Sequence, residues 1–281
     1  MSMCTKLPRV SQPPGIPLSV RRAALFPSAN FPTFPPGYPT RLVRVDGVAV
    51  LLSAGMPMAL VLPERVADRA VEATLAAVRD LLRVDGTPQG IWLVPEDADP
   101  ADLTDRLLRA GLTPNDRPPF EPRGAAMAIV EPPPPGPLDV AAHRVRSYDE
   151  YIGAQEAAAD AFGMDAEMRA AFADRAERLW EFEREGGPSA TFVATLGGEV
   201  AGLGNAWFGP AAVYLRGSGV RPRYRGRSVY RALVRARWEA AVEAGVPALT
   251  VGAGQMSRPA LERLGFSIVG WYDCLIDDLT A

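Results

Sequence analysis

The sequence predicts an α/β protein in which a mixed, mostly antiparallel sheet is flanked by helices, with two such units in tandem. The 281 residues are 48% hydrophobic and 22% charged, which is the composition of a folded protein. The expected strands and helices follow one another in a mixed order, unlike the regular alternation of a doubly wound parallel sheet. The order in the first half of the chain is similar to that in the second half, which indicates two related units.

The first 40 residues are expected to form an extended arm that is disordered or wrapped on a domain. Nine of the 28 prolines lie between Pro8 and Pro39. Because proline lacks a backbone donor and is excluded from helix interiors, this composition favours extended chain. A role as a proline-motif ligand stays open for the arm.

Residues 41–131 are predicted to form the first unit. Asp46-Gly47 between two apolar runs is a two-residue hairpin signal. Apolar residues at helical spacing after Pro63 predict a long helix. The predicted elements are a hairpin at 41–52, a helix at 63–83, a strand at 91–94, a helix at 102–110 and a strand at 125–130. Residues 132–137 form a stiff proline-rich linker, which is the predicted domain boundary.

Residues 138–281 are predicted to form the second unit. Ser147 and Glu150 have the spacing of a capping box at a helix start. Gly197-Gly198 joins two apolar runs as a hairpin turn. The predicted elements are a strand at 143–146, helices at 147–162 and 166–184, strands at 191–196, 199–208 and 212–220, a helix at 228–244, a strand at 248–251, a helix at 257–264 and a strand at 266–276.

The composition excludes several kinds of protein. No apolar run reaches the roughly 18 residues of a membrane-spanning helix, and the N-terminus lacks the apolar core of a signal peptide. Cys4, Cys274 and the single histidine, His143, cannot form a structural zinc site or a disulfide framework. We therefore expect a cytoplasmic protein with no bound metal and no membrane partner.

The positive charge is concentrated in one segment. The formal net charge of −3 gives no general reason to expect a nucleic-acid partner. Between Arg216 and Arg237, however, eight arginines stand in 22 residues without an acidic residue, so the rest of the chain carries about −11, which is −3 minus 8. Because no aromatic stacking platform accompanies the arginines, we expect one polyanionic ligand rather than DNA or RNA.

Arg223-x-x-Gly226-x-Ser228 stands at the junction between the predicted strand 212–220 and the predicted helix 228–244. A helix N-terminus offers unpaired amides and the positive end of the helix dipole, which together bind phosphate or pyrophosphate. Glycine lets the backbone approach the ligand closely, and flanking arginines add charge. The junction is therefore predicted to be a phosphate site.

Val220-x-Pro-x-x-Arg-Gly-x-Ser228 resembles the acyl-CoA loop of the GNAT superfamily of N-acyltransferases. The loop of that family reads Gln or Arg, two residues, Gly, one residue, then Gly or Ala. Arg223 and Gly226 match this pattern, and Ser228 stands at the last small position. The stretch 257–266 is similar to the last helix of the family and the step into its final strands.

The resemblance implies direct transfer of an acyl group, usually acetyl, from acyl-CoA to a primary amine in a ternary complex. Acetyl-CoA would be the co-substrate, and the acceptor would be a small molecule or a peptide. Backbone groups near Ser218 and Val220 would pair with the pantetheine arm, while the amides of residues 225–230 would hold the pyrophosphate. The coenzyme-binding residues so implied are Ser218, Val220, Arg223, Arg225, Gly226, Arg227, Ser228, Val229 and Tyr230.

The catalytic acid is the point at which this sequence departs from the family pattern. Leu261 occupies the position of the tyrosine that many members have in the last helix, and Gly254 that of a frequent asparagine. The reaction needs a base for the amine proton, an acid for the leaving thiolate and a donor for the oxyanion. The side chains that can replace the tyrosine are Tyr214, Arg216, Tyr230, Ser257 and Tyr272, of which Tyr214, Ser257 and Tyr272 are the predicted catalytic residues.

Structural roles stay open for these three residues. Tyr214 also suits the wall of a pocket, Ser257 the N-cap of a helix and Tyr272 interior packing. Unassisted departure of the thiolate is chemically possible as well, because a thiol is a good leaving group.

Three further interpretations concern the site and the first unit. Gly252-x-Gly-x-x-Ser257 with Asp273 imitates a dinucleotide fingerprint, but only eight residues follow Asp273, too few for a nucleotide-binding half-domain. Because Leu261 replaces the usual tyrosine, a non-catalytic acyl-CoA-binding or sensing module is the alternative function. The segment 53–63 holds no arginine, so we interpret the first unit as a degenerate copy that has lost phosphate binding.

Overall fold

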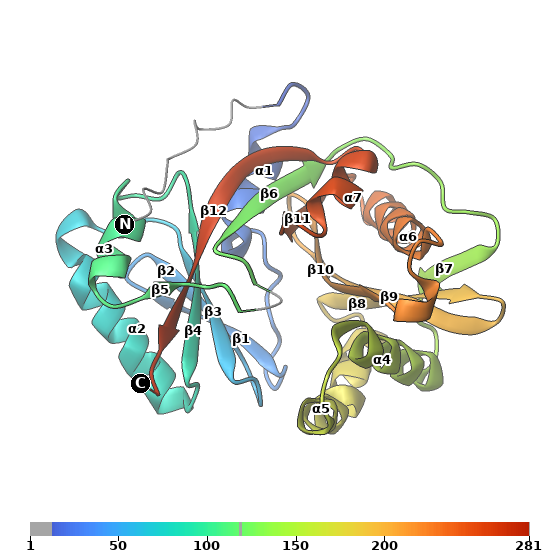
Figure 1. Cartoon of the computed structure of the whole chain (residues 1–281), viewed down its shortest axis with the longest axis horizontal. Helices are drawn as coiled ribbons and strands as arrows, with labels where there is room; N and C mark the ends of the chain where they lie inside the picture. The colour runs from blue at the N-terminus through green and yellow to red at the C-terminus, as the bar shows by residue number, and fades with distance from the viewer. Residues whose placement is uncertain (1–12, 118–119, 281) are drawn as a thin grey trace.

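The computed structural model describes residues 13–117 and 120–280 of the chain (Figure 1). Its strands are β1 (Thr40–Val45), β2 (Val48–Ser53), β3 (Met58–Pro63), β4 (Gln89–Pro95), β5 (Thr113–Pro114), β6 (Arg123–Ile129), β7 (Val140–Arg144), β8 (Ser189–Leu196), β9 (Glu199–Phe208), β10 (Val213–Val220), β11 (Leu249–Ala253) and β12 (Ser267–Asp278). They form one sheet of order β1-β2-β3-β4-β12-β6-β11-β10-β9-β8-β7, and β5 pairs with β12. Only the pairs β3–β4 and β10–β11 are parallel within the described residues. The predicted α/β fold with a mixed, mostly antiparallel sheet is therefore confirmed.

Helices cover both faces of this sheet. The α-helices are α1 (Leu18–Leu25), α2 (Val71–Asp85), α3 (Leu103–Arg109), α4 (Tyr148–Phe162), α5 (Ala166–Arg184), α6 (Val229–Glu243) and α7 (Arg258–Arg263), and the short 3₁₀ helices are η1 (Pro27–Ala29), η2 (Asp68–Ala70) and η3 (Pro222–Tyr224). Over strands β7 to β10, α6 lies on one face and α4 with α5 on the other (Figure 1). Alternate side chains of these strands therefore enter two separate apolar cores.

Local sequence signals specify several of these elements as predicted. Asp46 and Gly47 have φ values of +42° and +85°, which are the positive angles of the tight turn between β1 and β2. The hydroxyl of Ser147 accepts a hydrogen bond from the Glu150 amide at 3.2 Å and caps α4. These turns and caps depend on neighbouring residues alone, which is why the sequence predicts them.

The helix predicted at 63–83 begins later, because residues 58–63 form the strand β3. The run from Met58 to Pro63 is apolar, and its alternate side chains pack into two different apolar cores, so both faces of the strand are covered. Such a buried strand lacks the alternating pattern that marks a half-exposed one. The helix α2 starts only at Val71. The strand that precedes the helix of the first unit, and so corresponds to β10, is therefore β3.

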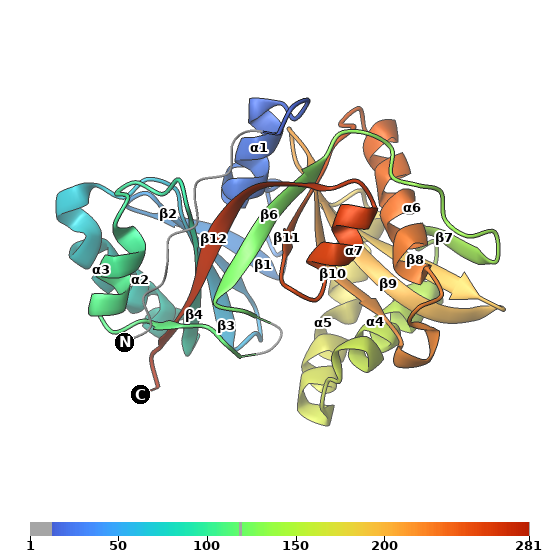
Figure 2. The same ribbon diagram turned by 45° about the horizontal axis from the view of Figure 1, so that its top comes forward.

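The two halves of the chain contribute strands to each other. β6 belongs to the predicted first unit, yet it pairs with β11 and β12 of the second. β12, at the end of the chain, pairs with β6 through Ser267–Asp273 and with β4 of the first unit through Tyr272–Asp278. Figure 2 shows β12 crossing from one half to the other. Strands from the two sides of residues 132–137 are thus hydrogen-bonded to one another in one sheet. A domain boundary at these residues therefore stays a prediction from the sequence.

The described part of the predicted N-terminal arm, residues 13–39, is wrapped on the sheet. α1 packs on β6, β11 and β12 and adds four side chains of its own to an apolar core there. Farther along, the buried Asn30 donates to the Ala212 carbonyl at 2.8 Å and accepts from the amides of Ala211 and Ala212 at 3.0 and 3.2 Å. This side chain fixes the arm at the turn between β9 and β10. The prediction for residues 1–12 lies outside the described residues.

Candidate functional site

The parallel strands β10 and β11 separate soon after they meet. Only two residue pairs are in register, Val213 with Leu249 and Tyr214 with Thr250. The parallel strands β3 and β4 of the first unit hold four residue pairs together. Beyond Tyr214, the edge of β10 that faces β11 therefore carries backbone groups with no strand partner in the described chain. An extended ligand can pair with such an edge.

A bulge in β10 places Arg216 and Ser218, which are two residues apart, on opposite faces of the sheet. The register with β9 shifts by one residue between Arg216 and Gly219, and Gly217 has a φ of +51°. Arg216 points to the face that carries α4 and α5, where it contacts β9 side chains. Ser218 points to the other face and bonds to Arg237 of α6. One strand thus presents side chains to both sides of the gap between β10 and β11.

The predicted phosphate loop lies between β10 and α6. Gly226 has a φ of +76°, and a Cβ added there would meet no atom within 4 Å, so a ligand can approach the backbone. Ser228 has a φ of +58°, which is unfavourable for a residue other than glycine. The first hydrogen bond of α6 runs from the Ala232 amide to the Ser228 carbonyl at 3.2 Å. The amides of residues 229–231 precede this bond and are free to bind an anion.

Three arginines of the loop differ in their partners. Arg223 donates to Glu199 at 2.5 Å, so part of its charge is compensated. Arg227 lies 3.8 Å from Asp139, and both side chains are largely exposed. Arg225 donates to two backbone carbonyls, at 3.0 and 3.4 Å, which leave its charge uncompensated. Of the three, Arg225 has the charge best placed for an anion beside the free amides.

Arg237 is a site residue that sequence reasoning missed. It is fully buried under β9 and β10, where its Nη1 donates to the Ser218 hydroxyl at 2.6 Å and to the Asn205 carbonyl at 3.3 Å. The glycine at 204 makes room for it, because a Cβ there would lie 2.7 Å from the guanidinium carbon. The signal in the sequence was an arginine on the apolar face of α6, four residues after Leu233.

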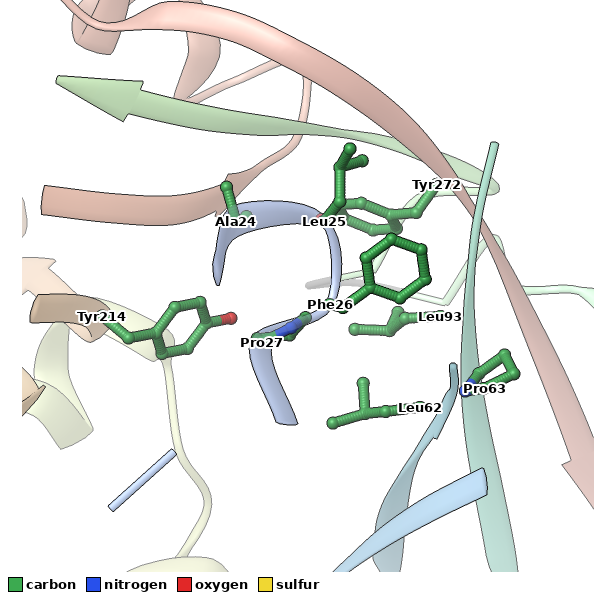
Figure 3. Close-up of a pocket in the computed structure, with 10 residues that line it drawn as sticks. Ala24, Leu25, Phe26, Pro27, Leu62, Pro63, Leu93, Tyr214 and Tyr272 are labelled. Atoms are coloured by element: carbon green, nitrogen blue, oxygen red, sulfur yellow. The ribbon is translucent and has the colours of Figure 1, made fainter. Parts of the chain in front are cut away.

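Tyr214 and Tyr272 point toward one another at a small pocket (Figure 3). The Tyr272 ring crosses two neighbouring strands over glycines. A Cβ added to Gly124 would lie 2.2 Å from its Cζ, and one added to Gly252 would lie 2.9 Å from its hydroxyl. The hydroxyl of Tyr272 therefore reaches from β12 to the region where β10 and β11 separate. The pocket is lined by Ala24, Leu25, Phe26, Pro27, Leu62, Pro63, Leu93, Tyr214, Gly252 and Tyr272.

Both hydroxyls are protonated at neutral pH. Burial raises the pKa of Tyr214 and that of Tyr272. The side chain of Tyr214 also raises the pKa of Tyr272, which agrees with their place in the lining of the same pocket (Figure 3). A protonated tyrosine can donate a hydrogen bond to an oxygen or sulfur that gains negative charge.

The remaining predicted donors have other surroundings. The Ser257 hydroxyl precedes α7 and donates to the Gly254 carbonyl at 3.4 Å, without capping the helix. Tyr230 packs against the main apolar core from the first turn of α6, and burial raises its pKa. Leu261 is completely buried in the same core. The last helix therefore presents an apolar side chain at the position where the sequence resemblance led us to expect a tyrosine.

An aromatic wall, made of Phe31, Phe34, Tyr38, Trp207 and Tyr214, stands beside the pocket. The Trp207 ring lies 4.9 Å from Phe31 and 5.3 Å from Phe34, measured between ring centres. Phe31 also contacts Tyr214, at 5.7 Å. The wall thus joins the N-terminal arm to β9 and β10, an arrangement that the sequence does not reveal because its members are far apart in the chain.

The described residues contain neither an activated cysteine nor a metal-binding cluster. Burial in β12 raises the pKa of the Cys274 thiol to about 11, so it is protonated and unsuited to act as a nucleophile. Residues 13–117 and 120–280 hold no group of three or more His, Cys, Asp or Glu side chains that could bind a metal ion. None of the helices in these ranges has the length and apolar character needed to cross a membrane.

Comparisons with known proteins bear on the whole arrangement. The model of the Acetyltransferase (GNAT) family matches residues 155–266. A comparison with curated proteins gave no match. A GCN5-related N-acetyltransferase from Kribbella flavida has a similar structure, with a TM-score of 0.65 and 16% sequence identity over 92% of this chain and 95% of that chain.

Two further solved structures have the same fold. A tandem GNAT protein from the clavulanic acid biosynthesis pathway has a TM-score of 0.60 and 16% identity, over 93% of this chain and 94% of its own. A GCN5-related N-acetyltransferase from Sphaerobacter thermophilus has a TM-score of 0.56 and 16% identity, over 83% and 81%. The matched segment 155–266 contains the loop, the bulged strand and the last helix described above. The chain thus carries a domain of the Acetyltransferase (GNAT) family at residues 155–266, and as a whole it has the fold of two GNAT-like units in tandem.

Proposed function

We propose that this protein is an acyl-CoA-dependent N-acyltransferase that transfers acetyl from acetyl-CoA to a primary amine in a ternary complex. The observation that carries the proposal is the open phosphate loop beside a strand edge that has lost its partner. The family match supports acyl-CoA as the donor class. The second unit carries the proposed site, because in the first unit β3 and β4 stay paired and the loop 64–70 contains no glycine.

The residues proposed to bind the coenzyme follow one another along the chain. The backbone of Ser218 and Val220 would pair with the pantetheine arm at the free edge of β10. The amides at the start of α6, with the open backbone at Gly226, would hold the pyrophosphate. The full set proposed is Ser218, Val220, Arg223, Arg225, Gly226, Arg227, Ser228, Val229 and Tyr230.

Tyr214 and Tyr272 are the hydroxyl donors that we propose for catalysis. The amine nitrogen forms a bond to the thioester carbon, the carbon–sulfur bond breaks, the amine loses a proton and the sulfur gains one. A protonated tyrosine at the gap between β10 and β11 can stabilise the developing oxyanion or protonate the departing sulfur. Ser257 stays a predicted candidate, although its hydroxyl already has the Gly254 carbonyl as an acceptor.

A non-catalytic acyl-CoA-binding module is the second candidate. The observation in its favour is that a completely buried leucine, Leu261, stands at the position that the family resemblance assigns to the tyrosine donor. Acetyl-CoA would bind to such a module without turnover. Release of free thiol in the presence of an amine panel separates the two functions.

The experiment combines calorimetric binding of acetyl-CoA with an assay of thiol release. The double variant Arg225→Ala with Gly226→Asp should lose acetyl-CoA binding, because it removes a cation and adds an anion beside the free amides. Gly245→Asp is the matched control, since Gly245 also has a positive φ of +74° and open space around it but lies at the far end of α6. Unchanged affinity in the double variant would refute the proposed phosphate site.

A further inference from the structure

Arg216 of β10 lies on the aromatic wall. Its guanidinium carbon is 3.9 Å from the centre of a Trp207 ring, which is a close cation–π contact. The residue is exposed to solvent, yet burial by the groups around it lowers the pKa of the guanidinium. The guanidinium thus lies against the aromatic wall and is still open to a ligand from solvent. An arginine remains protonated there, so Arg216 is a cation and not a proton donor.

No carboxylate compensates this charge in the part of the chain that the structure describes. Three tyrosines raise the pKa of Arg216 electrostatically, namely Tyr38, Tyr151 and Tyr214. A second cation, Arg175 of α5, lowers it. Glu183, which acts on Tyr151, has other partners, because each of its carboxylate oxygens accepts a hydrogen bond from Thr191.

Arg175 is also without an acidic partner among the described residues. Its Nε donates to the Ala171 carbonyl at 3.2 Å and its Nη1 to the Ala54 carbonyl at 3.0 Å. Burial lowers its pKa as well. Two partly desolvated cations without a negative partner raise the free energy of the unliganded protein. An anion that binds between them lowers this free energy.

We propose that the amine acceptor carries a carboxylate and that Arg216 binds it. The inference rests on the proposed acyl transfer and specifies the substrate class. A planar guanidinium forms two parallel hydrogen bonds with a carboxylate. Because Arg216 follows Tyr214 by two residues on the same face of β10, a carboxylate bound at Arg216 holds the attached amine beside the gap between β10 and β11.

The test compares amine acceptors that differ only in this anion. The panel contains the common amino acids, their carboxamides and phosphoethanolamine, with acetyl-CoA as donor and thiol release as the readout. We expect the acids to have a higher kcat/KM than their carboxamides. Arg216→Gln should lower kcat/KM for the acids by about 10- to 100-fold, and leave the values for the carboxamides and the KM for acetyl-CoA unchanged. Arg216→Lys should recover part of the loss.

The control is Arg69→Gln, which removes the same charge from an exposed residue of η2 in the first unit. Thermal unfolding midpoints show that the variants fold. Three outcomes overturn the proposal: equal losses for acids and carboxamides, no turnover of any acid, or preference for phosphoethanolamine. The failure of the proposed function is seen separately, since the wild-type protein would then either not bind acetyl-CoA or bind it without turnover of any amine in the panel. Turnover of amines without a preference for acids overturns the carboxylate assignment alone.

Discussion

Arg237 donates a hydrogen bond of 2.6 Å to the hydroxyl of Ser218, and so connects the middle of α6 to the bulge of β10. The guanidinium is completely buried and has no carboxylate partner within the described residues, and its Nη2 has no hydrogen-bond partner there. Burial lowers the pKa of Arg237 to about 10, so the group is still charged at neutral pH. A buried guanidinium destabilises the fold unless its N–H groups have acceptors. The hydrogen bond to Ser218 therefore stabilises the folded protein.

Ser218→Ala should weaken the binding of acetyl-CoA. The substitution removes an acceptor from the buried guanidinium of Arg237 and releases the bulge, at a cost of about 1–3 kcal/mol in the free energy of unfolding. Since the backbone of this bulge is proposed to pair with the pantetheine arm, we expect a higher KM for acetyl-CoA and a nearly unchanged kcat. Urea unfolding and steady-state kinetics measure both effects. Ser218→Thr keeps the hydroxyl and is the control, and a wild-type KM in Ser218→Ala would contradict the prediction.

Tyr272→Phe and Tyr214→Phe should each lower kcat. Each removes one hydroxyl from the gap between β10 and β11, and loss of a proton or hydrogen-bond donor costs about 100-fold or more in rate when the donor acts in the transition state. The KM for acetyl-CoA should change little. Tyr148→Phe, at an exposed position of α4, is the control. If both variants keep the wild-type kcat, neither tyrosine is the donor.

Gly124→Ala should displace the Tyr272 ring. The added Cβ would lie 2.2 Å from the Cζ of that ring, so strand or ring must move, and we expect a loss of about 1–3 kcal/mol in the free energy of unfolding. In the Tyr272→Ala background the same change should cost much less. The coupling in this double-mutant cycle, measured by urea unfolding, is the control for general damage to β6. Additive effects would show that the ring does not depend on this glycine.

The sequence predicts a phosphate loop because the signals for such a loop are local. Gly226 and Ser228 stand within one turn of a helix start, and a motif of fixed spacing reports their backbone angles and neighbours. The hairpin turn at Asp46 and the cap at Ser147 are predictable for the same reason. By contrast, the strand at 58–63 is apolar throughout, because both faces are covered, and so lacks a period that separates it from a helix.

The proposed catalytic side of the site depends on contacts between distant segments. Tyr272 reaches the gap only because β12 is paired with β6 of the other half, over the glycines at 124 and 252. The aromatic wall depends on where the N-terminal arm docks, and a proline-rich composition contains no information on that position. Arg237 combines both situations. The sequence shows its charge on an apolar helix face, but it does not show its partner, because the Ser218 hydroxyl belongs to another element.

Asn30→Ala should loosen the wall without affecting the phosphate loop. The side chain satisfies three backbone groups at the turn between β9 and β10, and their loss costs about 1–3 kcal/mol. Because Phe31 is the next residue and packs on Trp207, we expect a higher KM for the amine acceptor and an unchanged KM for acetyl-CoA. Steady-state kinetics checks this, with Thr33→Ala at an exposed position of the arm as control. A wild-type amine KM in Asn30→Ala would contradict the assignment of the wall to the acceptor.

Glu183 should make the protein less stable as the pH rises. Burial raises the pKa of this carboxyl, although the Thr191 amide and hydroxyl bond to it at 2.5 and 2.9 Å. The folded protein therefore holds the proton at pH values where the unfolded chain, with an ordinary pKa near 4.5, has lost it. The unfolded state then binds fewer protons, so the contribution of Glu183 to stability decreases from about pH 4.5 up through the raised pKa of the folded state.

Glu183→Gln isolates this contribution, because glutamine keeps the shape and does not titrate. The Thr191 amide can still donate to its oxygen, and the Thr191 hydroxyl can accept from its NH₂ group. We expect the wild-type free energy of unfolding to fall relative to that of Glu183→Gln as the pH rises from 5 to 8, measured by urea unfolding at each pH. Glu185→Gln, at an exposed glutamate two residues along, removes one carboxylate without the burial and should show no such trend. A constant difference between wild type and Glu183→Gln would mean that Glu183 ionises at the same pH in the folded and unfolded chains.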